Sequence, residues 1–84
     1  MEVYKKYLKG RYHVLKMGQA DVEKGMVLFK EIIDDAPGFA LAYFGMNLAY
    51  TLLGTIGLLP AVESFMQGKY FLDKGIELGP DLPE

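Results

Sequence analysis

Few side chains in this 84-residue chain could carry out chemistry: it has no cysteine and a single histidine, His13. Without cysteine, thiol catalysis, disulfides and zinc–thiolate sites are excluded. One imidazole cannot form a zinc site without other good ligands, so we expect His13 to be a packed or solvated side chain. The acidic group Glu31, Asp34 and Asp35 lacks the alternating oxygen ligands and glycine turn of a calcium loop, and is expected to be a solvated helix end. The sequence therefore predicts no metal and no other cofactor.

Motifs that would activate a nucleophile or hold a phosphate are missing from the sequence. Ser64 does not stand in a Gly-x-Ser-x-Gly elbow, and the chain has no Gly-x-x-x-x-Gly-Lys loop. The carboxylates of Asp73 and Glu77 lie at the spacing of one helical turn, with Lys69 and Lys74 nearby, as is typical of surface ion pairs. The chain is therefore predicted to have no catalytic residues and not to be an enzyme.

Charge is distributed unevenly along the chain. Residues 1–16 carry five basic residues and one acidic residue, whereas residues 17–84 carry four basic and ten acidic residues, and the total is −2. A basic helix could contact phosphates, but the rest of the chain is acidic. We therefore expect this segment to dock on an acidic partner, or on the acidic part of a second copy, and we do not expect it to bind nucleic acid.

The segment 36–62 has no charged residue in 27 positions. This length could span a bilayer, and a buried helix of a small α-helical protein has a similar composition. Asn47 near its middle and Pro60 near its end favour the buried helix. Charges throughout residues 1–16 leave no apolar core for a signal peptide, so a cytoplasmic protein without a membrane partner is expected. The alternative is a small membrane-associated helical protein that uses segment 36–62.

Glycine and proline divide the chain into four predicted helices, over residues 3–17, 19–35, about 39–53 and about 60–78. Apolar residues recur every three or four positions, and no segment alternates with period two, which favours helices over strands. The predicted fold class is therefore all-α, with four antiparallel helices.

An internal repeat relates the second and fourth predicted helices at a distance of 43 residues. The superposed pairs are Gly25 and Gly68, Phe29 and Leu72, Ile33 and Ile76, and Pro37 and Pro80. Helix pairs that repeat at about this distance are typical of α-solenoids, in which neighbouring pairs stack to cover each other's apolar faces.

The run from Ala40 to Gly54 resembles the first helix of a tetratricopeptide repeat. Tyr43, Met46 and Tyr50 stand at the large aromatic, leucine and tyrosine positions of that pattern, and Gly54 stands at the glycine before the second helix. This resemblance implies two helical hairpins that form part of an α–α superhelix.

Three residues depart from the repeat pattern. Asn47 stands where the pattern has glycine or alanine for close helix contact. Gly25 and Gly68 stand where alanine is usual, which should weaken each helix by about 1 kcal/mol. The second unit is also longer than the usual repeat because of residues 55–64.

Segments 7–13, 39–43 and 57–60 resemble the repeat region of multidomain bacterial signalling proteins, in which the repeats follow an adenylyl cyclase, a serine/threonine kinase or a winged-helix domain. The resemblance implies one domain over residues 1–84, with units at about 3–36 and 38–79. Residues 79–84 resemble the link into a further repeat, so the chain is expected to be part of a longer array.

The same resemblance implies a scaffold for protein–protein interaction in signalling. The matched helix would contact a partner protein or peptide through its apolar groove positions, which could alternatively complete the core. A second group, on the outer face of the fourth helix, is expected to mediate self-association as a homodimer, because two units are fewer than a stable array needs. The groove positions are Leu41, Phe44, Leu48 and Thr51, and the self-association positions are Phe65, Met66, Tyr70 and Phe71.

Overall fold

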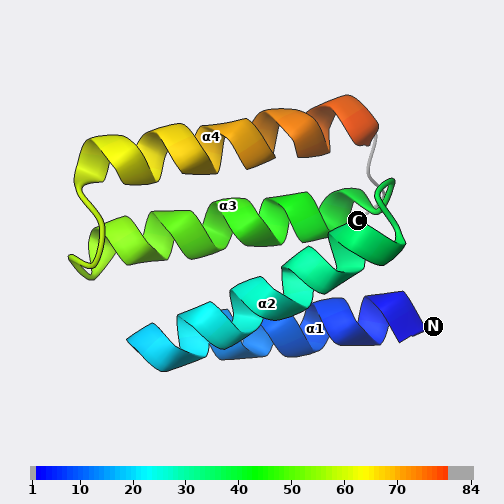
Figure 1. The fold of residues 1–84 in the computed structure, drawn as a ribbon, viewed down its shortest axis with the longest axis horizontal. Helices are drawn as coiled ribbons and strands as arrows, with labels where there is room; N and C mark the ends of the chain where they lie inside the picture. The colour runs from blue at the N-terminus through cyan, green and yellow to red at the C-terminus, as the bar shows by residue number, and fades with distance from the viewer. Residues whose placement is uncertain (1, 80–84) are drawn as a thin grey trace.

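Four helices make up most of the computed structural model, which describes residues 2–79 (Figure 1). They are α1 (Glu2–Val14), α2 (Gln19–Asp35), α3 (Ala40–Thr55) and α4 (Ala61–Leu78). No strand occurs among the described residues, so the predicted all-α class is confirmed. Helices α1 and α2 form one hairpin, α3 and α4 form another, and α3 packs against both helices of the first. Residues 80–84, which include Pro80 and most of the predicted link, lie outside the described residues.

The start of α2 follows the local signals in the sequence. Gly18 is its N-cap, with extended backbone angles, and Asp21 lies in the first turn, near the positive end of the helix dipole.

Helix α1 is shorter than predicted, because it ends at Val14 and not at residue 17. The backbone N–H groups of Lys16 and Met17 donate to the carbonyls of His13 and Val14, which turns the chain sharply, and Met17 has a left-handed φ of 64°.

Gly54 and Gly57 were both predicted to end the third helix near residue 53, and of the two only Gly57 does so. The helix continues to Thr55, and Gly54 lies within it directly against Ser64 of α4. The break comes at Gly57, whose φ of +83° lies in the region that favours glycine.

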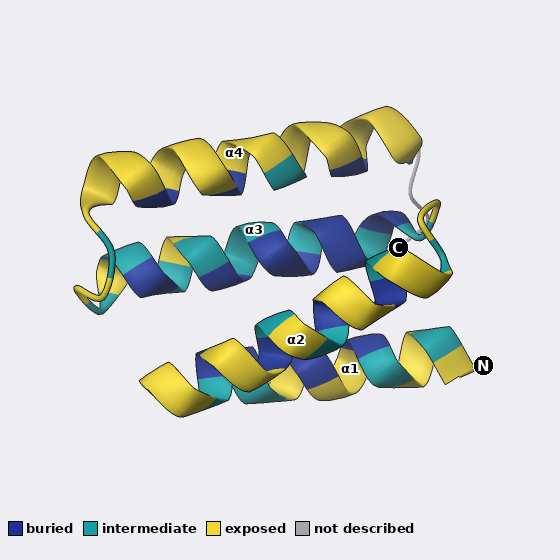
Figure 2. Ribbon diagram, in the orientation of Figure 1, coloured by how far each residue is buried: buried dark blue, intermediate teal, exposed yellow. Residues whose placement is uncertain are grey.

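Helix α3 is the central element of the fold, because it contacts each of the other three helices. Most of its residues are buried or half-buried (Figure 2). A helix surrounded in this way has little room for hydrated charges, which accounts for the part of the uncharged run that lies in α3. Within residues 2–79, no helix is both long enough and apolar enough to cross a membrane.

The core of the molecule is organised around Phe29 of α2, which is fully buried. Its ring lies between Gly10 of α1 and Gly45 of α3. A Cβ atom added at Gly10 would lie 2.8 Å from Phe29 Cε1, and one at Gly45 would lie 2.6 Å from Phe29 Cζ. The two glycines therefore leave the space that the ring occupies, and one side chain joins three helices.

Candidate interaction surface

The four residues predicted to line a groove lie along α3, but they are not equally accessible. Leu41, Phe44 and Leu48 are half-buried, whereas Thr51 is exposed. Leu41 and Leu48 pack against the core cluster. The ring of Phe44 lies against Gly75 of α4, where an added Cβ atom would be 2.7 Å from Phe44 Cε1. Three of the four side chains thus contribute to the packing of the fold, and Thr51 is the most open of them.

The four residues predicted to mediate self-association lie on different sides of α4. Phe65, Met66 and Tyr70 are exposed. Phe71 is half-buried and stacks on Tyr50 of α3, with ring centroids 5.8 Å apart and an interplanar angle of 14°. The prediction that Phe71 lies on the outer face of α4 is therefore wrong. The helical period puts it on the same side of α4 as the buried residues that face α3.

Apart from Phe71, small residues form the side of α4 that packs on α3. The buried residues of α4 are Ser64, Gly68 and Gly75. Ser64 Oγ donates a hydrogen bond of 2.6 Å to the Tyr50 carbonyl. Because small residues occupy most of the contact between α3 and α4, the bulky apolar residues of α4 remain largely on its outer surface (Figure 2).

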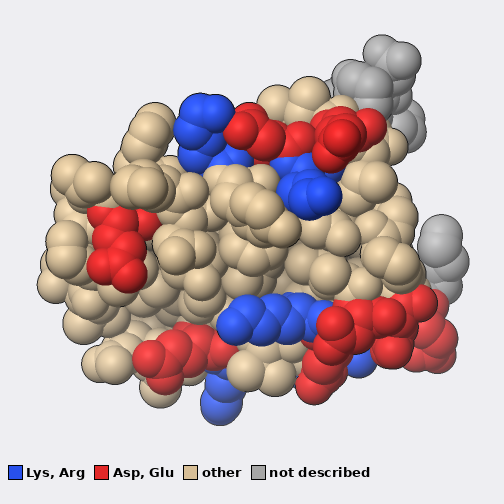
Figure 3. All heavy atoms as spheres, turned by 45° about the horizontal axis from the view of Figure 1, so that its top comes forward, with Lys and Arg blue, Asp and Glu red and all other residues tan. Residues whose placement is uncertain are grey.

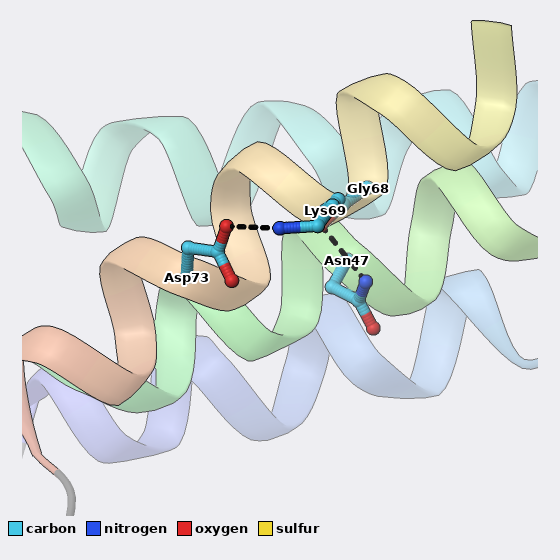
Figure 4. Close-up of polar contacts among 4 residues, drawn as sticks. All are labelled: Asn47, Gly68, Lys69 and Asp73. Carbon is cyan, nitrogen blue, oxygen red and sulfur yellow. Dashed lines mark hydrogen bonds and ion pairs between the residues drawn. The ribbon is translucent and has the colours of Figure 1, made fainter.

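The two unusual residues Asn47 and Gly68 are in direct contact (Figure 4). Asn47 Nδ2 donates a hydrogen bond of 2.9 Å to the Gly68 carbonyl. A Cβ atom at Gly68 would lie 3.2 Å from that nitrogen, which is closer than ordinary contact. The larger residue on α3 is therefore accommodated by the smaller residue on α4. Beside them, on the exposed side of α4, Lys69 and Asp73 form the predicted type of surface pair, with an N···O distance of 2.8 Å.

Replacing Asn47 with aspartate should lower the free energy of unfolding by about 1–3 kcal/mol, because it removes the donor and leaves a carboxylate beside the Gly68 carbonyl. Urea denaturation followed by circular dichroism measures the change. Gln67→Glu makes the same amide-to-acid exchange at an exposed position of α4, and should change stability by no more than about 0.5 kcal/mol. Equal effects of the two substitutions would show that the Asn47 hydrogen bond does not stabilise the hairpin.

Two adjoining hollows lie between α3 and α4. One of about 190 Å³ and one of about 310 Å³ share Thr51, Ser64 and Phe65 in their linings. The first extends to Leu72 and the second to Ala61. We call this region the α3–α4 edge and define it by Thr51, Phe65 and Leu72. Figure 3 shows one face of the molecule with a broad central area of uncharged residues, bordered by charged side chains above and below and by an acidic group at the left. Leu72 was found in the sequence repeat but was not predicted to belong to a surface site.

Two polar contacts, one of them from the candidate residue His13 and one from the candidate residue Glu31, join α1 to α2. His13 Nδ1 lies 3.3 Å from Asp21 Oδ1 and joins the end of α1 to the start of α2. Lys6 Nζ lies 2.9 Å from Glu31 Oε1, and this hydrogen bond raises the pKa of Lys6 above its ordinary value. Within residues 2–79, no three histidine, aspartate or glutamate side chains gather in a way that could hold a metal ion.

No known protein family, curated protein or solved structure matches this chain. The α3–α4 edge must therefore be interpreted from its own geometry and chemistry.

Proposed function

We propose that this chain is a non-catalytic protein–protein interaction module. In this proposal it is a tetratricopeptide-like scaffold from a larger cytoplasmic signalling protein, and it binds an apolar helix of a partner protein along the α3–α4 edge. It also associates with itself. The observation that carries the proposal is the exposure of large apolar side chains on α4, with Phe65 67% exposed beside the two hollows. Exposed apolar residues that cluster on one surface mark interaction sites in soluble proteins.

The arrangement of the helices supports the scaffold. Two hairpins are joined through α3, which packs on both helices of the first hairpin. Tyr43 and Met46, which match the packing positions of the repeat pattern, are both buried. Tyr43 Oη also donates a hydrogen bond of 2.9 Å to the Pro37 carbonyl, which ties the start of α3 to the loop before it.

The chemistry of the α3–α4 edge favours an apolar partner. Thr51, Phe65 and Leu72 offer no charge to a carboxylate or phosphate, and the two charges beside them, Lys69 and Asp73, are paired with each other. Helices that bind in grooves do so mainly by burying apolar residues at helical spacing. An apolar face of a helix therefore fits this edge better than an acidic peptide or a nucleic acid.

The proposal predicts that amphipathic helical peptides selected from a display library will bind the chain at the α3–α4 edge. Phe65→Glu should weaken that binding at least tenfold, because it places a charge in the apolar contact. Fluorescence anisotropy with a labelled peptide measures the affinity. Val27→Glu is the matched control, since Val27 is an exposed apolar residue of α2, and it should leave binding unchanged. If the library yields no binder, or only peptides that bind Phe65→Glu equally well, the proposed function is wrong.

A further inference from the structure

The internal repeat has a different environment in each of its two copies. Residues of α2 and α4 that are related by 43 positions fall into two groups. Gly25 and Gly68, which face the other helix of their own hairpin, are both buried. The apolar pairs differ. Phe29 and Val22 are fully buried, whereas Leu72 is 36% exposed and Phe65 is 67% exposed. The α4 side chains are therefore exposed at positions that are covered in α2.

Helix α3 covers the side of α2 that carries Phe29. The Phe29 ring lies against Gly45, on the side of α3 that is turned away from α4. The backbone of α4, in contrast, lies near α3 alone among the described helices, and no helix occupies the equivalent position beyond it. The α3–α4 edge is thus placed where a further first helix of a hairpin would pack.

Helix α1 is a first helix that carries exposed apolar residues on the side that no other described helix covers. Lys6 and His13 form pairs with residues of α2, so they mark the α2-facing side of α1. Leu8 follows Lys6 by two residues, about 200° around the helix, and is exposed. Leu15 follows His13 by the same step, in the turn directly after α1, and is also exposed. The same step in α3 leads from Asn47, which bonds to α4, to Ala49, which is fully buried in the core. The side of α3 that packs on the first hairpin therefore corresponds to the exposed side of α1.

The exposed side of α1 and the α3–α4 edge also differ in net charge. Tyr12 adds a large ring, 61% exposed, to this side of α1, and the Lys16 ammonium lies 4.6 Å from the centre of that ring. Residues 1–16 carry a net charge of +4, whereas the acidic residues of α4 outnumber its basic residues by three to two. Attraction between these segments favours their association.

We propose that α1 of a second copy docks on the α3–α4 edge, through the side that carries Leu8, Tyr12 and Leu15. This proposal rests on the proposed function, because it uses the same edge, and it names the partner as another copy of this chain. The contact joins two different surfaces, so a pair of copies still has one free α3–α4 edge and one free α1. Further copies can therefore add head to tail. A symmetric pairing of α4 with α4 would instead close after two copies.

Two substitutions distinguish the head-to-tail contact from the symmetric pairing of α4 with α4. Phe65→Glu blocks the α3–α4 edge, and Tyr12→Glu blocks α1, each at an exposed position. In sedimentation velocity over a wide range of concentration, the mass of the unmodified chain should rise beyond that of a dimer. Each variant alone should remain a monomer. An equimolar mixture of the two should recover a species of two chains, because one variant keeps a free α1 and the other keeps a free edge.

Each other outcome overturns the proposal. If Tyr12→Glu still dimerises while Phe65→Glu does not, the contact is the symmetric α4 pairing. If the unmodified chain is a monomer at every concentration, copies do not dock and the self-association in the proposed function is wrong as well, but peptide binding that is sensitive to Phe65→Glu would still support its partner-binding role. Val27→Glu should associate like the unmodified chain, and circular dichroism verifies that all variants are helical. A second pair, Leu72→Glu and Leu15→Glu, should reproduce the result if either first variant fails to fold.

Discussion

Replacing Phe29 with alanine should lower the free energy of unfolding by about 3–5 kcal/mol, the range found when large aromatic residues are removed from cores. The ring is fully buried and fills the space between Gly10 and Gly45, so its loss leaves a cavity where three helices meet. A chain of 84 residues has a total stability of about 4–13 kcal/mol. The variant is therefore expected to be marginally folded at room temperature, as measured by urea denaturation followed by circular dichroism.

Phe65→Ala is the matched control for this prediction, because it makes the same exchange on the exposed side of α4. It should change the free energy of unfolding by no more than about 0.5 kcal/mol. Similar losses in both variants would mean that Phe29 does not join the helices in the way the contacts indicate.

Gly25→Ala should destabilise the protein by about 1–3 kcal/mol, the usual cost of overpacking a core. Helix propensity alone predicts the opposite, a gain of about 1 kcal/mol. The Cβ atom would lie 2.6 Å from the Gly10 carbonyl oxygen and would also press on a Val14 methyl group. The carbonyl belongs to the backbone of α1, so the two helices must separate to make room. The loss is measurable as a lower thermal midpoint.

Gly38→Ala provides the comparison, because nothing lies within 4 Å of a Cβ atom at that loop position. Its effect on the thermal midpoint should be small. A higher midpoint for Gly25→Ala than for the unmodified chain would show that α1 moves away from α2 without cost, and the close approach of the two helices would then be unimportant for stability.

The sequence predicted helix boundaries well where the signals act locally. The bounds of α2, Gln19–Asp35, agree with the prediction, because Gly18 and Pro37 affect the backbone on their own. The ends of α1 and α3 were missed because they depend on other parts of the fold. Gly54 is read locally as a helix breaker, but in the structure its missing side chain makes room for Ser64 of the neighbouring helix.

The candidate site was predictable only in part, for a related reason. The apolar residues of α3 and α4 are visible in the sequence, but their orientation requires the register between the two helices. Phe71 faces Tyr50, whereas Phe65 faces solvent. Asn47 and Gly68 each departed from the repeat pattern when considered alone. They compensate for each other across 21 positions, and this is evident only once the helices are placed side by side.

The position of α4 at the end of the helix row has a consequence for how the molecule opens. Because its backbone lies near α3 alone, α4 can detach while the junction around Phe29 stays closed. Elements that bury few large apolar side chains are the first to open in local unfolding, and the buried residues of α4 are Ser64, Gly68 and Gly75. The connection 56–60, which contains the left-handed Gly57, would then act as a hinge. Two copies that open in this way can exchange their fourth helices, so α4 is the element through which this chain is most open to domain swapping.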